Sequence, residues 1–225
     1  PQVMKSCGVD ILGMPVEFLI SPWGGIFWLM AVTIALTFHE FLHALVAYSL
    51  GDQTPKSEGR VTPFPFPHID PLGFVLLLLF GFGWAKPVRF EPANLRYQTF
   101  GPTLVALAGP LANALLLIVT IALAQLLRGL TAGPLSVNAQ IFFASLIVAN
   151  SLLLVVNLIP LPPFDGSKFL LDLLRMLRLN GAYEFLIKNG RYLLVGLLLI
   201  DALSGLGIIG RLLSFVTKWA ATYIN

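Results

Sequence analysis

The chain has 225 residues, of which 57% are hydrophobic and only 11% are charged. Soluble domains carry about 25% charged residues, so this composition excludes an ordinary soluble globular protein. The net charge of +3, from 14 basic and 11 acidic residues, is too small and too dispersed for nucleic-acid recognition. The sequence therefore predicts an integral membrane protein in contact with the lipid bilayer and without a nucleic-acid partner.

Four apolar segments are long enough to cross a bilayer as helices, which takes about 20 residues. They cover residues 26–50, 103–127, 139–160 and 192–216. The last is interrupted by Asp201, to which no role is assigned, and by Gly205, Gly207 and Gly210. We expect an all-α, multi-pass protein with a single membrane domain over residues 1–225. Its core would cover about 26–178, and its C-terminal membrane segments about 183–222.

A fifth apolar run, residues 72–85, is bracketed by Asp70 and Lys86 and is too short to cross as a helix. We expect it to enter and leave the membrane on one side. Irregular backbone at membrane depth is tolerated only where protein or a water-filled cavity surrounds it. The run is therefore predicted to be irregular and to line a cavity.

The basic residues indicate the orientation, because short cytoplasmic loops collect Lys and Arg. If residues 72–85 do not cross, the regions 51–102 and 162–192 share one side and hold ten of the 14 basic residues. We therefore expect these regions on the cytoplasmic side of a prokaryotic cell membrane. Within them, residues 167–178 have the spacing of an amphipathic helix lying on the membrane surface, with Asp172 on its polar face.

The strongest functional signal is the sequence His39-Glu40-Phe41-Leu42-His43 in the first predicted span. Residues i and i+4 of a helix share a face, so both imidazoles can bind one Zn²⁺ while Glu40 acts as general base. Ionisable groups inside a membrane helix are costly and are normally kept for function. A chance match is therefore disfavoured.

Two histidines leave a catalytic zinc short of one ligand, because such sites take three protein groups and a water. The candidates are His68 and a carboxylate close to the membrane. Asp165 stands out because it ends an uncharged stretch, residues 129–164, after the third predicted span. The alternative for Asp165 is an N-cap on the following amphipathic helix. We favour ligation, since the zinc otherwise lacks a carboxylate donor.

Three motifs together resemble the site-2 protease family of intramembrane zinc metalloproteases in order and spacing. They are His39–His43, the Gly-Pro-Leu-Ala-Asn sequence Gly109–Asn113, and the Pro-rich sequence Asn157–Gly166. Three further stretches resemble the compact bacterial and archaeal branch of the family that lacks a PDZ domain. These are Arg60–Thr62, His68–Gly73 and Gly83–Val88. The resemblance covers about residues 33–175, most of the chain.

The resemblance implies a three-helix catalytic core and peptide-bond hydrolysis within the bilayer, on a single-span transmembrane protein as substrate. One Zn²⁺ per chain would be held by His39, His43 and Asp165, with Glu40 as the base. The region at about 60–98 would form short membrane-embedded strands and a loop that present an unwound substrate. No particular oligomeric state is indicated.

Two departures from the family pattern affect substrate handling rather than zinc ligation. The family often has a second glycine and an arginine after its Asp-Gly pair, where this chain has Ser167 and Lys168. It also often has an Asn-Pro-Leu sequence before the His-Ile-Asp motif, where this chain has residues 64–67, Phe-Pro-Phe-Pro.

Two asparagines at membrane depth, Asn113 and Asn157, offer donors and acceptors to an unwound substrate. By the resemblance, Asn157 would contact the substrate carbonyl near the zinc. The alternative is that both asparagines tie helices together, as polar side chains often do in bilayers. His68 and Asp70 are candidates for support of a zinc ligand, for transient metal binding, for gating, or for bracing of the loop.

A second function class uses the same His and Asp groups as the transit site of a membrane metal transporter or sensor. Transporters usually have repeated halves and several polar spans. The single compact ligand set and the adjacent Glu40 favour the enzyme.

Overall fold

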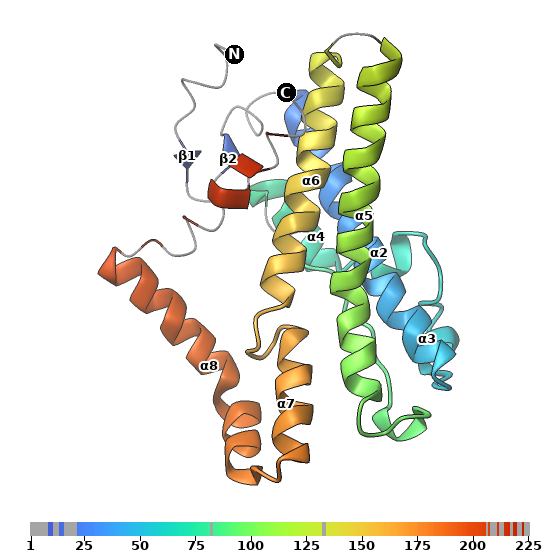
Figure 1. Cartoon of the computed structure of the whole chain (residues 1–225), viewed down its shortest axis with the longest axis vertical. Helices are drawn as coiled ribbons and strands as arrows, with labels where there is room; N and C mark the ends of the chain where they lie inside the picture. Colours follow the sequence, from blue (N-terminus) through green and yellow to red (C-terminus); the bar gives the residue numbers. More distant parts are fainter. Residues whose placement is uncertain are drawn as a thin grey trace.

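Three long helices form the body of the molecule: α2 (Pro22–Ser49), α5 (Gly101–Thr131) and α6 (Val137–Asn157). In this computed structural model, the described residues are 9–10, 14–15, 22–81, 83–131, 134–205, 207, 211, 214–216, 218–219 and 222. Each long helix packs against the other two (Figure 1). All three are long and apolar enough to cross a membrane. This confirms three of the predicted spans and the prediction of an all-α, multi-pass membrane protein.

Small residues hold the three helices together, while large apolar residues cover their outside. Ala31 and Ala35 of α2 are fully buried and lie in one core cluster with Leu117 of α5 and Ile147 of α6. Small side chains allow the close helix approach that drives association in lipid. Along α5, the exposed large side chains are apolar and suit contact with lipid: Leu104, Leu111, Leu115, Ile118, Val119, Leu123, Leu126 and Leu130.

The structure describes mainly the first half of the fourth predicted span, residues 192–216. Helix α8 covers Asn180–Ser204 and ends where Gly205 adopts a left-handed conformation with φ of 67°. It is not among the helices suited to cross a membrane, since Glu184 and Lys188 lie in its first half. Much of the predicted segment after Ser204 lies outside the described residues. Two-residue strands near the N-terminus, β1 (Val9–Asp10) and β2 (Met14–Pro15), pair antiparallel.

The short apolar run forms a helix, α4 (Pro71–Phe80), where irregular backbone and strands were predicted. Asp70 caps α4 by accepting a hydrogen bond from Gly73 N at 2.8 Å, and a proline at the first helical position favours this start. Helix α4 therefore corrects the expected irregular run. Between residues 60 and 98, the one β-pairing within the described part is an isolated bridge of Ile69 with Ala85. The two ends of the run thus lie side by side, as expected for a segment that enters and leaves on one side.

Two glycines allow the chain after α4 to return closely along the start of the helix. A Cβ at Gly83 would lie 2.1 Å from Gly73 O, which no larger residue tolerates. The C-terminal end of α4 is tied to α2, because Trp28 Nε1 donates to Gly81 O at 2.8 Å. Helix α4 therefore has a fixed place beside α2.

The loops after α2 are organised by the carboxylate of Asp52, which is fully buried. The segment includes α3 (Thr54–Ser57) and the 3₁₀ helices η2 (Phe66–His68) and η3 (Pro92–Asn94). Asp52 accepts hydrogen bonds from Thr54 N at 3.1 Å, Thr54 Oγ1 at 2.7 Å, Glu91 N at 2.7 Å and Asn94 Nδ2 at 3.2 Å. Burial would raise the pKa of Asp52, but the hydrogen bonds from Glu91 and Thr54 outweigh it and lower this pKa. One ionised carboxylate thus joins both ends of the segment.

We expect Asp52→Asn to reduce the free energy of unfolding by about 1–3 kcal/mol. The amide NH₂ of asparagine would face N–H or O–H donors of Thr54, Glu91 or Asn94 where a carboxylate oxygen now accepts their hydrogen bonds. Thermal unfolding in detergent measures this loss, with the exposed Glu58→Gln as control. Because the pKa of Asp52 is lowered on folding, its stabilisation is present above the unfolded pKa of about 4 and is lost as the pH falls through the folded pKa. The difference between wild type and variant should therefore shrink below about pH 4. A stability difference between wild type and Asp52→Asn that does not change with pH would contradict an ionised Asp52 in the folded protein.

Helix α7 (Gly166–Met176) confirms the predicted amphipathic helix but corrects its polar face. Asp172, expected to be exposed, is buried and accepts a hydrogen bond from Thr103 Oγ1 of α5 at 2.6 Å. This contact attaches α7 to the start of α5.

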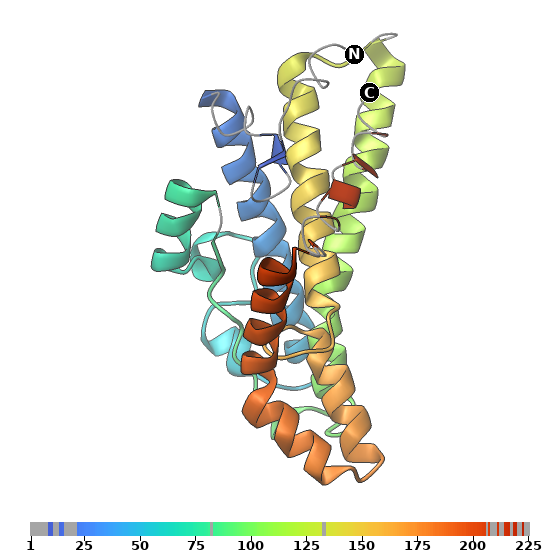
Figure 2. The same ribbon diagram turned by 90° about the vertical axis from the view of Figure 1, so that its left-hand side faces the viewer.

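The connections of α2, α5 and α6 to the functional loops lie at one end of the helix bundle. Helix α2 ends there, α5 begins there, and α6 leads from there into α7 (Figures 1 and 2). The end of α5 and the start of α6 lie at the opposite end. Apart from α4, which lies beside the middle of the bundle, the basic regions 51–102 and 162–192 are thus brought toward the same end of the molecule, as the charge distribution predicts.

Candidate metal centre

Helix α2 places His39 and His43 one turn apart on a face that packs against α5. Both side chains are buried, with 4% and 7% exposure. Their rings are nearly perpendicular, and their Nε2 atoms lie 3.0 Å apart. The i, i+4 spacing thus brings both imidazoles to one point, as the sequence predicts.

The partners of the Nδ1 atoms determine which ring nitrogens carry protons. His43 Nδ1 lies 2.7 Å from Val105 O, a carbonyl that can only accept a hydrogen bond. His39 Nδ1 lies 2.7 Å from Asn113 Oδ1. In a neutral imidazole whose Nδ1 donates, the lone pair is on Nε2. With both rings neutral, the two facing Nε2 atoms present their lone pairs to one point, where a cation would accept them.

Asn113 is held in this orientation by two further contacts and is fully buried. Its Nδ2 donates to Ala35 O at 3.2 Å and to Asn150 Oδ1 at 3.1 Å, and this fixes Oδ1 toward His39. Asn150 Nδ2 in turn donates to Leu146 O at 2.8 Å. These contacts link α2, α5 and α6 and favour the helix-tying alternative for Asn113 over direct substrate contact.

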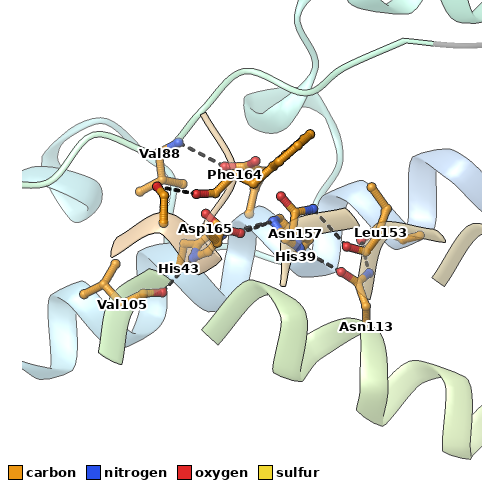
Figure 3. Close-up of polar contacts among 12 residues, drawn as sticks. His39, His43, Val88, Val105, Asn113, Leu153, Asn157, Phe164 and Asp165 are labelled. Carbon is orange, nitrogen blue, oxygen red and sulfur yellow. Dashed lines mark hydrogen bonds and ion pairs between the residues drawn. The ribbon is translucent and has the colours of Figure 1, made fainter. Parts of the chain in front are cut away.

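Asp165 brings a carboxylate to the two histidines from the segment after α6 (Figure 3). Its Oδ2 lies 3.1 Å from His39 Nε2 and 3.3 Å from His43 Nε2. Asp165 occupies the N-cap position of α7, yet its side chain makes no capping hydrogen bond. The geometry therefore supports ligation rather than capping. Within the described part of the chain, His39, His43 and Asp165 form the group able to hold a metal, and His68 is not part of it.

The triangle of donor atoms fits zinc. Zinc–ligand distances of about 2.0–2.2 Å in a tetrahedral site place ligand atoms about 3.3–3.6 Å apart, close to the separations found here. The observed separations are 3.0, 3.1 and 3.3 Å. Asp165 Oδ2 is also buried and receives no hydrogen bond from the described residues. Such an orphaned oxygen facing two lone pairs matches a metal ligand.

Glu40 lies beside the ligands and is held by two groups from the loops. Its Oε2 accepts a hydrogen bond from Val88 N at 2.9 Å and lies 3.8 Å from Arg60 Nη2. The side chain of Glu40 retains 12% exposure. Glu40 is thus fixed in direction but accessible, as a general base requires.

The other predicted site residues lie in loop and helix-end positions. His68 is buried, and its Nε2 lies 2.9 Å from Thr62 O. Asp70 caps α4. Both positions fit the loop-bracing alternative. Asn157, the last residue of α6, is half-buried, and its Nδ2 donates to Leu153 O at 3.0 Å.

Curated proteins with similar sequences identify the family of the chain. The chain is 37% identical over 147 residues to "Putative zinc metalloprotease YwhC" of Bacillus subtilis, covering 64% of this chain and 67% of that protein. MJ0611 of Methanocaldococcus jannaschii, of the same description, is 33% identical over 63% of this chain and 68% of its own length. Rip2 of Mycolicibacterium smegmatis, also of that description, is 32% identical over 62% of this chain, but the match spans only about half of that relative, 52%. The chain belongs to the site-2 protease family. No protein-family model matches the chain, and no solved structure does.

The family and the donor set agree on the metal. Two imidazoles and one carboxylate form a set of three protein ligands typical of catalytic zinc. Zn²⁺ is thus the cofactor that fits this member of the site-2 protease family.

Sequence reasoning did not single out Gly109, although it lies in a motif of the family. A Cβ at Gly109 would lie 2.3 Å from His43 Nε2 and 2.5 Å from His39 Cε1. Gly109 therefore lets α5 approach both imidazoles directly. The turn of α5 that precedes Gly109 supplies the Val105 carbonyl to His43. Glycine next to proline inside a predicted span was the available signal.

We expect Gly109→Ala to weaken zinc binding by about 10- to 100-fold, because the added methyl group displaces both imidazoles from their orienting partners. Zinc content after dialysis against a graded chelator measures the effect. Gly129→Ala on the same helix is the matched control, since a Cβ there meets nothing within 4 Å. Equal zinc retention by the two variants would contradict the close packing of α5 on the site.

Proposed function

We propose that this protein is an intramembrane zinc endopeptidase of the HExxH type. It would hydrolyse a peptide bond in or near the transmembrane segment of a single-span membrane protein. One observation carries the proposal: three metal-ligating atoms lie within 3.3 Å of one another, and two of them, with the adjacent Glu40, belong to a helix suited to cross a membrane. Ionisable groups at this depth are retained only where they work.

In this proposal His39, His43 and Asp165 hold the zinc, and Asn113 and Val105 orient the two imidazoles. When bound, the zinc would polarise the scissile carbonyl and acidify the attacking water. The hydrogen bonds from the two imidazoles to Asn113 and Val105 fix the ring orientations and raise the basicity of the ligating nitrogens.

Glu40 moves the proton. Its carboxylate accepts a proton from the attacking water and delivers it to the nitrogen of the leaving amine. The hydrogen bond from Val88 N to Oε2 holds one oxygen, which leaves Oε1 for the proton. Glu40 therefore serves first as base and then as acid without a change of position.

Substrate handling falls to groups at the same end of the bundle. A helical substrate must be unwound before attack, and its freed backbone groups need partners where water is scarce. Asn157 is the proposed partner of the substrate carbonyl, because it is half-buried at the end of α6, close in sequence to Asp165. We place this end of the bundle on the cytoplasmic side of a prokaryotic cell membrane, on the strength of its basic loops.

The test is cleavage of single-span membrane proteins by the purified protein in detergent, with products identified by mass spectrometry. We expect cuts within or next to the transmembrane segment, their loss on chelation, and their return with added zinc. Zinc flux into liposomes without any cleavage would instead identify a metal transporter and overturn the proposal.

A further inference from the structure

Arg60 is a charged side chain buried where few arginines are found. It retains 1% exposure, yet it lies in a loop between α3 and η2. Its Nη1 donates to Pro67 O at 2.7 Å, and its Nη2 donates to Lys86 O. The same Nη2 lies 3.8 Å from Glu40 Oε2. One guanidinium therefore contacts two loop segments and the proposed catalytic base.

The two carbonyls that Arg60 binds flank the β-bridge of the region. Pro67 lies two residues before Ile69, and Lys86 follows Ala85, the partner of Ile69 in the bridge. Lys86 N also donates to His68 O at 2.8 Å. Two residues further on, Val88 N reaches Glu40. Arg60 thus binds the segment Lys86–Val88, which also supplies the backbone N–H that contacts Glu40.

Burying a guanidinium is costly unless it is paired and hydrogen-bonded. In the described part of the chain, Glu40 is the carboxylate within ion-pair distance of Arg60. A planar fork can bind two carbonyls and face a carboxylate at once, whereas a lysine ammonium acts as a single point charge. The contacts of Arg60 therefore depend on the planar, forked guanidinium, which lysine lacks.

We propose that Arg60 is a positioning residue for peptide cleavage. It sets the place of the Glu40 carboxylate relative to His39 and His43, and it fixes the segment Lys86–Val88 beside that carboxylate. The proposal rests on the proposed function, in which Glu40 is the base. Arg60 itself would touch neither the metal nor the reacting atoms.

The experiment compares wild type, Arg60→Gln and Arg60→Lys with a substrate that the wild type cleaves, measuring kcat, KM, zinc content and melting temperature. The exposed Arg191→Gln on α8 is the matched control. We expect Arg60→Gln to keep one zinc per chain and a KM within about threefold, while kcat falls about 10- to 100-fold, as misplaced catalytic groups cause. Arg60→Lys should recover part of kcat, because it restores the charge without the fork.

A wild-type kcat in Arg60→Gln would overturn the proposal, as would a loss confined to KM or to zinc content. If Arg60→Gln does not fold, Arg60→Lys decides, since a folded lysine variant with unchanged kcat also overturns it. Failure of both variants to fold would assign Arg60 to the integrity of the fold instead. The proposed function fails separately, when wild type and Glu40→Gln cleave equally or not at all.

Discussion

Replacing Glu40 by glutamine is expected to lower the rate of peptide cleavage by about 10²- to 10⁴-fold while zinc stays bound. Glutamine keeps the size of the side chain, and its carbonyl oxygen can still accept the hydrogen bond from Val88 N. It cannot take a proton from water or return one to the leaving nitrogen. The variant therefore removes the proton transfer without disturbing the three ligands.

The measurement is cleavage of a single-span substrate together with metal analysis of the same preparation. Glu184→Gln, the same change at an exposed position on α8, is the control and should cleave normally. Cleavage by Glu40→Gln at the wild-type rate would remove Glu40 from the mechanism. Loss of zinc from this variant would instead indicate that Glu40 takes part in metal binding.

Replacing Asp165 by alanine is expected to have the second large effect, a loss of zinc and with it of cleavage. The substitution removes the oxygen that lies 3.1 and 3.3 Å from the two Nε2 atoms. Removal of groups that only orient a ligand already weakens metal binding by about 10- to 100-fold, so loss of the ligand itself should exceed this range. Capping is not lost, because the Asp165 side chain makes no capping bond to α7.

Metal analysis after dialysis checks this expectation, with the exposed Glu184→Ala as control. An Asp165→Ala protein that retains one zinc per chain would show that the third ligand comes from elsewhere. Melting temperature separates the cases, since a variant that loses zinc but still unfolds cooperatively has lost a ligand and not the fold.

Much of the fold was predictable because charge is so scarce in this chain. Gaps between charged residues located α2, α5 and α6, and the i, i+4 histidines of α2 indicated a metal site. The helix α4 was not predicted, since a run of ten apolar residues lacks a decisive period. Helix α8 begins close to residue 183, the predicted start of the C-terminal segments, whereas the fourth predicted span began only at residue 192 because hydropathy searches for uninterrupted apolar stretches.

The surroundings of the site depended on contacts between helices, which spacing along the chain does not reveal. Arg60 was counted among the basic loop residues and in a stretch that resembles the family, but its burial against Glu40 was not predicted. Asp172 fitted a polar helix face, yet it bonds to Thr103. A carbonyl such as that of Val105 carries no side-chain signal at all, although it fixes a predicted ligand.

The origin of the three proposed ligands has a consequence for how the molecule comes apart. His39 and His43 belong to α2, whereas Asp165 follows α6, and most of the chain lies between them. A metal held by all three would act as a removable cross-link that closes this long loop and restricts the unfolded chain. Chelation should then detach the α6–α7 junction from α2 before the opposite end of the bundle unfolds. Limited proteolysis of the chelated protein should therefore cut first at residues 158–165.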